Sequence, residues 1–217
     1  MEQGYQAILF DLDGVLCHTD QYHYQAWKVI ADKLHTVFTP EDNNRLRGVS
    51  RMESLNILLE KCPREVPAEE REMLATEKNG IYRELLTKMT PDDLDPEVRE
   101  TLFTLRRQGI KMAVASSSKN TPLILARLEL DHFFDAVVDG NQITHSKPDP
   151  EVFLRAAQAL GFAPDQCLVV EDAEAGVDAA IAGGFDSAAI GDAVNCHKAT
   201  YDLDSLKQLV LIAGIAK

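Results

Sequence analysis

Two aspartates near the start of the chain, Asp11 and Asp13, are the residues whose types and spacing most directly indicate chemistry. Asp11 follows four apolar residues, 7–10, which predict a short strand buried on both faces. Gly14 comes directly after Asp13 and lets the backbone turn sharply. Two carboxylates this close to a buried strand repel each other and lose hydration unless a cation lies between them. The pattern favours a metal site, and an aspartate that only closes a turn is the alternative.

Polar side chains also follow later segments of the chain: Ser116, Lys147, and the pair Glu171 and Asp172. The segments before Ser116 and Glu171 are short and apolar, as expected for buried strands. Since the carboxyl ends of parallel strands meet at one edge of a sheet, these groups are expected to converge with the two aspartates. Carboxylates suit Mg²⁺, and a hydroxyl beside a lysine suits a doubly charged anion such as phosphate. The predicted metal ligands are Asp11, Asp13, Glu171 and Asp172.

The periodicity of the chain from residue 95 onward predicts an α/β fold. Apolar strand-like segments alternate there with helical segments, which is typical of a Rossmann-like, doubly wound parallel sheet. We predict this architecture for the core. Strands are expected at 7–10, 112–115, 136–138, 167–170 and 187–190, helices at 96–108, 120–130, 150–160 and 173–182, and a closing strand and helix after 192.

The segment 16–89 has no comparable strand signal and is rich in helix-forming residues. We expect it to form an α-helical cap domain inserted after the first strand, with residues 1–15 and 90–217 forming the core domain. An insertion at this point lies above the carboxyl edge of the sheet, where it can act as a lid.

Two features of the predicted cap could belong to a binding site. Thr19, His23 and Trp27 recur at four-residue spacing and share one helix face, although a half-buried structural face is the alternative. The turn at 45–51 contains three arginines and precedes a helix that Ser50 can cap. Such a turn suits an anion, and a solvated basic turn is the alternative.

Lys78 lies in the charged helical segment 67–89. A lysine in such a helix is normally solvated, and its spacing alone gives no reason to select it.

Composition and charge argue against several classes of function. The chain has 217 residues, with 22 Lys and Arg against 35 Asp and Glu, and a net charge of −13. This charge argues against nucleic acid or an anionic membrane as a partner. No signal peptide or membrane-spanning segment is expected from the apolar pattern. The four cysteines show no CxxC motif and no disulfide-like spacing, so we expect a reducing, cytoplasmic setting. A monomer is a separate expectation, which no motif in the sequence supports.

The polar positions, taken in order, resemble the four motifs of the haloacid dehalogenase superfamily of phosphotransferases. The matching elements are the segment DLDGV at 11–15, Ser116 after an apolar strand, Lys147-Pro148, and Glu171-Asp172. The resemblance spans essentially the whole chain. It implies that Asp11 is the nucleophile, that Asp13 is the general acid/base and that Mg²⁺ is the cofactor. The second aspartate favours phosphoryl transfer, because dehalogenating members lack it.

Within that superfamily, the cap segments look like those of the β-phosphoglucomutases. This resemblance implies that Arg51, Ser118 and Asn120 hold the phosphate that is not reacting, and that Thr19 and His23 align the proton-transfer groups. Ser116 and Lys147 complete the implied catalytic set. The implied substrate-binding residues are Trp27, Arg47, Gly48, Val49, Ser50, Arg51, Ser54, Lys78, Ser116, Ser117, Ser118, Lys119, Asn120 and Lys147.

The implied reaction interconverts β-D-glucose 1-phosphate and β-D-glucose 6-phosphate through an aspartyl-phosphate, with β-glucose 1,6-bisphosphate as activator and intermediate. A magnesium-dependent sugar-phosphate phosphatase on the same fold is the closest alternative, since water could replace the sugar hydroxyl. A phosphorylatable receiver module is another, although it would be smaller and lack the helical insertion. His18 and Arg47 depart from the family, which often has an acidic residue and a lysine at these positions. Both departures could alter cap closure or sugar preference.

Overall fold

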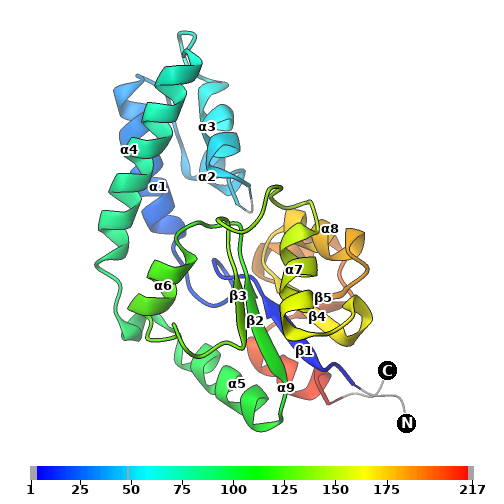
Figure 1. The fold of residues 1–217 in the computed structure, drawn as a ribbon. Helices are drawn as coiled ribbons and strands as arrows, with labels where there is room; N and C mark the ends of the chain where they lie inside the picture. The colour runs from blue at the N-terminus through cyan, green and yellow to red at the C-terminus, as the bar shows by residue number, and fades with distance from the viewer. Residues whose placement is uncertain (1–3, 48, 215–217) are drawn as a thin grey trace.

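The structure is a computed structural model and describes residues 4–47 and 49–214. Its sheet has six parallel strands in the order β3-β2-β1-β4-β5-β6 (Figure 1). This order is that of a doubly wound dinucleotide-binding sheet, so the predicted architecture is confirmed. The strands are β1 Ala7–Phe10, β2 Lys111–Ala115, β3 Ala136–Val138, β4 Cys167–Glu171, β5 Asp186–Ile190 and β6 Tyr201–Leu203.

Strand β1 lies at the centre of the sheet and is buried on both faces. Ile8 and Phe10 belong to one apolar cluster, whereas Ala7 and Leu9 belong to another, because successive side chains of a strand point to opposite faces. Helices cover both faces, as a parallel sheet requires. The first face packs against α5 (Pro96–Arg107), α6 (Thr121–Arg127) and α9 (Leu209–Ile212), and the second against α7 (Glu151–Leu160) and α8 (Glu174–Ala182).

Helix α6 is shorter than the predicted 120–130, because it ends at Arg127. Glu129 has a φ of +57°, which takes the chain out of the helix before Leu130. The ends of other helices follow the sequence signals. The Asp95 carboxylate accepts a hydrogen bond from the Glu97 N–H at 2.7 Å and caps α5, and Gly161 ends α7 at a φ of +81°.

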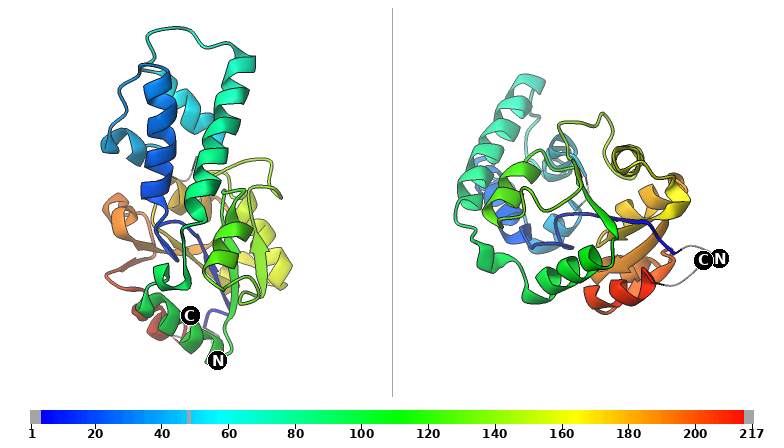
Figure 2. Two further views of the ribbon diagram at one scale, coloured as in Figure 1. Left: turned by 90° about the vertical axis from the view of Figure 1, so that its left-hand side faces the viewer. Right: turned by 60° about the horizontal axis from the view of Figure 1, so that its bottom comes forward.

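The described residues of the segment 16–89 form four helices, three of which supply side chains to an apolar cluster of their own. Figures 1 and 2 show them grouped on one side of the sheet, beyond the carboxyl end of β1. Trp27, Ile30, Leu55 and Leu74 are fully buried in this cluster. The division into domains at residues 16 and 89 stays a prediction. The helices are α1 Asp20–Lys33, α2 Pro40–Asn44, α3 Arg51–Leu59 and α4 Ala68–Leu86.

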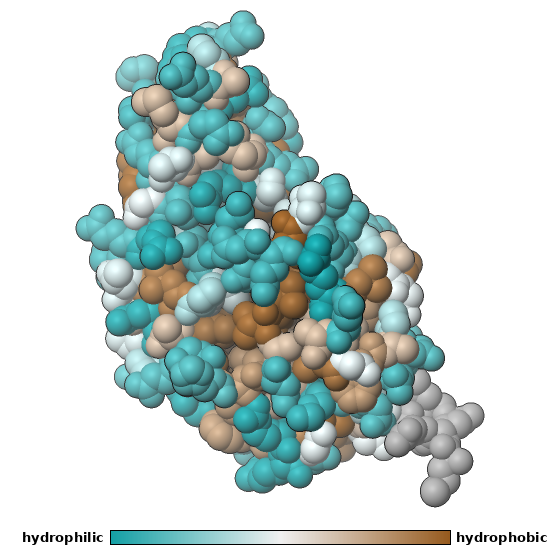
Figure 3. Space-filling model, in the orientation of Figure 1, coloured by the Kyte–Doolittle hydropathy of each residue, from teal (hydrophilic) through white to brown (hydrophobic). Residues whose placement is uncertain are grey.

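The edge strand β3 is only partly covered. Ala136 and Val137 are half-buried there, and Figure 3 shows hydrophobic residues gathered over this region, between α6 and α7. None of the described helices combines the length and apolarity needed to cross a membrane. Four 3-10 helices among the described residues complete the fold: η1 Pro91–Asp93, η2 Pro164–Gln166, η3 Gly191–Cys196 and η4 Leu206–Gln208.

Candidate active site

Three carboxylates meet where the strand order reverses, between the neighbouring strands β1 and β4. Asp11 follows β1, Glu171 ends β4 and Asp172 follows it. One oxygen from each lies within 4.8 Å of the other two. The crevice at the carboxyl ends of such strands is where open parallel sheets bind ligands. The structure therefore brings Asp11 together with Glu171 and Asp172, as the sequence predicted.

Lys147 is the counter-charge of this acidic group, although only 2% of the residue is exposed. Its Nζ contacts Asp11 Oδ1, lies 2.5 Å from Glu171 Oε1 and donates to the Ala115 carbonyl at 3.2 Å. Burial alone would lower the pKa of Lys147, but the charges of Asp11 and Glu171 outweigh it and raise that pKa. Lys147 therefore stays protonated at neutral pH beside the nucleophile proposed from the sequence.

One lysine does not balance three buried carboxylates. Burial raises the pKa of Asp172 to about 8, and the charges of Asp11 and Glu171 add to the effect. Burial also raises the pKa of Glu171, against the opposing charge of Lys147. Carboxylates that are this difficult to ionise require further positive charge, and their hard oxygen donors suit Mg²⁺. The residues present fit that ion.

Gly14 allows the loop after β1 to pass against Asp172. Its φ is +88°, and a Cβ added there would lie 2.0 Å from Asp172 Oδ2. A side chain at position 14 would therefore displace a carboxylate of the acidic group. This confirms the turn expected from the sequence.

The carboxylate of Asp13 points away from this group and binds the start of the cap. It accepts hydrogen bonds from the Thr19 N–H at 2.8 Å and the Thr19 hydroxyl at 2.5 Å. Burial raises the pKa of Asp13 to about 7, and the charge of Asp20 adds to this rise. Asp13 is thus suited to exchanging a proton near neutral pH. Its assignment as a metal ligand stays a prediction, because its oxygens are not in the three-carboxylate group.

His23 and Lys78 form a buried pair on the cap side. Lys78 Nζ lies 2.9 Å from His23 Nδ1 and 4.9 Å and 4.5 Å from the ring centroids of Trp27 and Tyr82. Only 3% of Lys78 is exposed, so it is not the solvated lysine that is usual in a charged helix. Burial lowers the pKa of Lys78 to about 7, helped by the charge of Arg51. Burial also holds the pKa of His23 well below its usual value, so its ring is neutral 3.6 Å from Asp13.

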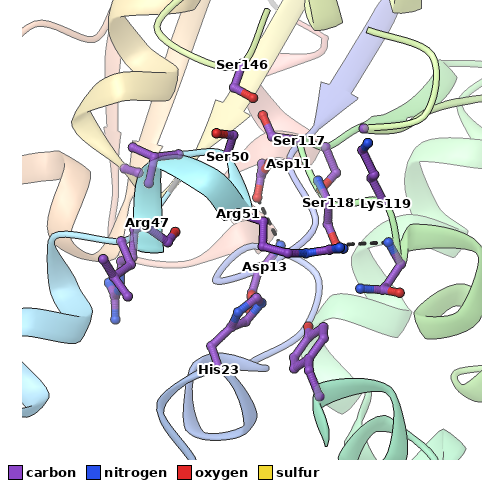
Figure 4. Close-up of a pocket in the computed structure, with 18 of the residues that line it drawn as sticks. Asp11, Asp13, His23, Arg47, Ser50, Arg51, Ser117, Ser118, Lys119 and Ser146 are labelled. Atoms are coloured by element: carbon purple, nitrogen blue, oxygen red, sulfur yellow. Dashed lines mark hydrogen bonds and ion pairs between the residues drawn. The ribbon is translucent and has the colours of Figure 1, made fainter. Parts of the chain in front are cut away.

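A cavity of about 280 Å³ joins the acidic group to the cap helices. Figure 4 shows Asp11 and Asp13 near its middle, with His23 and Arg51 contributed by the cap and Ser117, Ser118 and Lys119 by the core. Lys147 and Thr19 do not line it but contact lining residues, and Gly48 lies outside the described residues. The predicted residues that line it are Asp11, Asp13, His23, Trp27, Arg47, Val49, Ser50, Arg51, Ser54, Lys78, Ser116, Ser117, Ser118, Lys119, Asn120, Glu171 and Asp172.

Several residues of the cavity were not singled out from the sequence. Tyr82 is buried, and its hydroxyl lies 2.8 Å from Thr19 Oγ1. Its position four residues after Lys78 places both on one helix face, which is a signal that could have found it. Asp20 and the loop 140–146 also line the cavity, and no spacing pattern marked them.

A six-stranded parallel sheet with acidic residues and a buried lysine at its switch point, beside the helices of the segment 16–89, is an α/β arrangement suited to phosphoryl transfer. Residues 5–184 match the family model described as haloacid dehalogenase-like hydrolase, and the chain belongs to this family. The resemblance noted from the four motifs is thereby confirmed.

Two curated relatives and one solved structure show how close the match is. The β-phosphoglucomutase of Bacillus subtilis is 40% identical over 188 residues, covering 86% of this chain and 83% of that protein. The phosphorylated carbohydrates phosphatase of Thermotoga maritima is 33% identical over 184 residues, covering 83% and 82%. The crystal structure of the β-phosphoglucomutase of Clostridium difficile has a TM-score of 0.88 and 36% identity, covering 94% of this chain and 93% of that one.

Proposed function

We propose that this chain is a magnesium-dependent β-phosphoglucomutase, which interconverts β-D-glucose 1-phosphate and β-D-glucose 6-phosphate. The observation that most supports the proposal is that Arg51, a cationic cap side chain, lines the same cavity as Asp11 and Asp13. A substrate that bears two phosphates requires positive charge away from the reacting centre. The mutases of Bacillus subtilis and Clostridium difficile support this proposal.

In this proposal Asp11 attacks the phosphoryl group of β-glucose 1,6-bisphosphate and becomes an aspartyl-phosphate. Lys147, which already contacts Asp11, offsets the repulsion between the attacking carboxylate and the phosphate. Mg²⁺, held by Asp11, Glu171 and Asp172, would supply further charge neutralisation at the transferring group when bound.

Asp13 handles the proton in both half-reactions. It protonates the leaving sugar oxygen when Asp11 is phosphorylated, and it removes the proton of the accepting hydroxyl when Asp11 is dephosphorylated. A pKa of about 7 suits both roles at neutral pH. Thr19 holds Asp13 toward the cap, so the proton-transfer group is connected to the element that covers the substrate.

The bisphosphate must turn around between the half-reactions, so that each phosphate is in turn the one that does not react. Arg51, with Ser118 and Asn120, is proposed to bind that phosphate in either orientation. Cap helices that exclude water would direct the phosphoryl group to the sugar.

A sugar-phosphate phosphatase is the second candidate, favoured by the relative from Thermotoga maritima. In that case water would attack the aspartyl-phosphate in place of the sugar hydroxyl, and the same core residues would serve. The cytoplasmic setting and the monomeric state stay predictions in either case.

The test is to incubate the protein with Mg²⁺, β-glucose 1-phosphate and a trace of β-glucose 1,6-bisphosphate, and to follow glucose 6-phosphate and inorganic phosphate together. We expect glucose 6-phosphate to accumulate without matching phosphate release. Phosphate release without isomerisation would show a phosphatase instead. Asp11→Asn is the control, because it keeps the fold and removes the nucleophile.

Arg51→Ala tests the role of the cap. We expect this variant to lose far more activity with the bisphosphate than with a small aryl phosphate, which has no second phosphate to bind. Equal losses with both substrates would show that Arg51 has only a structural role.

A further inference from the structure

Arg47 lies in the turn between α2 and α3 and is surrounded by carboxylates. Its Nη1 lies 2.8 Å from Asp192 Oδ2 and 3.7 Å from Asp172 Oδ2, and its Nη2 lies 2.5 Å from Asp20 Oδ2. Asp20 begins the cap helix α1, whereas Asp192 belongs to η3, which follows β5 of the sheet. A single guanidinium therefore joins the helices of the cap to the edge of the core.

These contacts distinguish Arg47 from Arg51. Both terminal nitrogens of Arg47 face protein carboxylates, so a substrate phosphate bound there would have to displace them. Arg51 has no carboxylate partner among the residues that the structure describes. Figure 4 shows Arg51 beside Asp13 in the middle of the pocket and Arg47 at its left-hand side, away from Asp11. The two arginines of one turn thus have different surroundings.

We propose that Arg47, held within the cap by Asp20, is a positioning residue which ties the cap to the core through Asp192 and so favours phosphoryl transfer to the sugar over transfer to water. The effect on phosphoryl transfer rests on the proposed function, whereas the ion pair between Arg47 and Asp192 does not depend on it. Water reaches an aspartyl-phosphate more readily when the cap is open, so a contact that favours closure lowers hydrolysis.

The exposure of this tie indicates that it can open and close. The side chain of Asp192 is 70% exposed and that of Arg47 is 27% exposed. Ion pairs with this much access to water are weak and screened by salt, so losing one is expected to shift an opening equilibrium by about two- to five-fold. The tie therefore biases the cap without preventing substrate exchange.

Asp192→Asn tests the proposal, because Asp192 is at the core end of the tie and does not line the cavity. The matched control is Glu70→Gln, which removes an arginine–carboxylate pair with Arg64 that lies entirely within the cap. Small-angle scattering of the substrate-free proteins should give a larger radius of gyration for Asp192→Asn at low salt and an unchanged one for Glu70→Gln. Raising the salt should bring the wild type toward the variant.

The second measurement is the ratio of glucose 6-phosphate formed to inorganic phosphate released. We expect Asp192→Asn to lower it by about two- to five-fold, with the KM for β-glucose 1,6-bisphosphate unchanged. Arg47→Gln should behave in the same way at saturating Mg²⁺, a condition that is needed because Arg47 also lies 3.7 Å from Asp172 of the acidic group. A rise in that KM with Arg47→Gln alone would show that Arg47 is a phosphate ligand and would overturn the proposal.

The two measurements separate the inference from the function on which it rests. An unchanged radius of gyration in both Asp192→Asn and Arg47→Gln would show that there is no tie. A changed radius with an unchanged product ratio would overturn the effect on transfer. If the wild type forms no glucose 6-phosphate, the proposed function fails, while scattering still decides whether the tie exists.

Discussion

Thr19 and Asp13 are joined by two hydrogen bonds, from the Thr19 N–H at 2.8 Å and from the Thr19 hydroxyl at 2.5 Å. Thr19 directly precedes the first cap helix, whereas Asp13 belongs to the loop after the central strand. Thr19 Oγ1 also lies 2.8 Å from the hydroxyl of Tyr82 in α4. The orientation of the proposed proton-transfer group is therefore determined by residues of the cap.

Thr19→Val should remove the hydroxyl while keeping the shape of the side chain. The substitution leaves the Tyr82 hydroxyl and one Asp13 oxygen without this buried partner, and we expect turnover to fall on the order of tenfold or more. Thr19→Ser keeps the hydroxyl and should retain most of the activity. Steady-state kcat for the sugar phosphate is the measurement. Equal losses in the two variants would contradict the role given to the hydroxyl.

Asp13→Asn should reduce turnover of the sugar phosphate by about 10²–10⁴-fold, because the proton of the sugar hydroxyl then has no acceptor. With an aryl phosphate, whose leaving group needs no proton, the substitution should reduce the rate of Asp11 phosphorylation much less. The rate of phosphoenzyme formation from each donor measures this difference. If the two donors lose rate equally, Asp13 is not the general acid/base.

Lys78→Met should stabilise the protein in a pH-dependent way. The pKa of Lys78 is lowered from 10.5 to about 7, so between these values the unfolded chain binds more protons than the folded one. Stability therefore rises with pH over that window, and the penalty of the buried charge is fully present below pH 7. We expect the variant to gain free energy of unfolding at pH 6, on the order of 1–4 kcal/mol, since loss of contacts with Trp27 and Tyr82 offsets part of the penalty.

Denaturant unfolding from pH 6 to pH 10 measures this effect, and the gain should shrink as the pH rises. Lys88→Met is the matched control, because Lys88 is exposed just beyond the same helix. A gain that does not change with pH would contradict the assigned cause.

Gly14→Ala and Gly80→Ala should have opposite effects. At Gly14 a methyl group would meet Asp172 Oδ2 at 2.0 Å on a backbone with a φ of +88°, so we expect lower stability and weaker Mg²⁺ binding. At Gly80, in the middle of α4, nothing lies within 4 Å of the added Cβ. Alanine there should stabilise the protein by about 0.4–1 kcal/mol. Thermal unfolding and Mg²⁺ titration of both variants test this pair, and a stabilised Gly14→Ala would contradict the close approach.

The sequence predicted the core part of the site best, because the geometry of a parallel sheet determines where the strand ends lie. Asp11 and Glu171 could be placed at one edge because parallel strands align their carboxyl ends, and apolar runs of four residues mark buried strands clearly. The end of α6 was less predictable, because Glu129 adopts a left-handed conformation that no sequence signal required.

The cap was harder to predict than the core. Lys78 lies in a charged helix, and only tertiary packing against Trp27 and His23 buries it. The surroundings of Arg47 depend on Asp192, which is 145 residues away in the sequence, and local spacing cannot indicate such a contact. Tyr82 was missed because an aromatic residue at helical spacing is normally part of a core.

The central claim is that Asp11 carries a phosphoryl group which it gives to a sugar, and a single-turnover chase tests it most directly. The protein would first be labelled with β-glucose 1,6-bisphosphate that carries radioactive phosphorus and then mixed with excess unlabelled β-glucose 1-phosphate. We predict that the label leaves the protein as sugar bisphosphate and that Asp11→Asn takes up none. Label that appears as inorganic phosphate at the same rate with and without the sugar would contradict the claim.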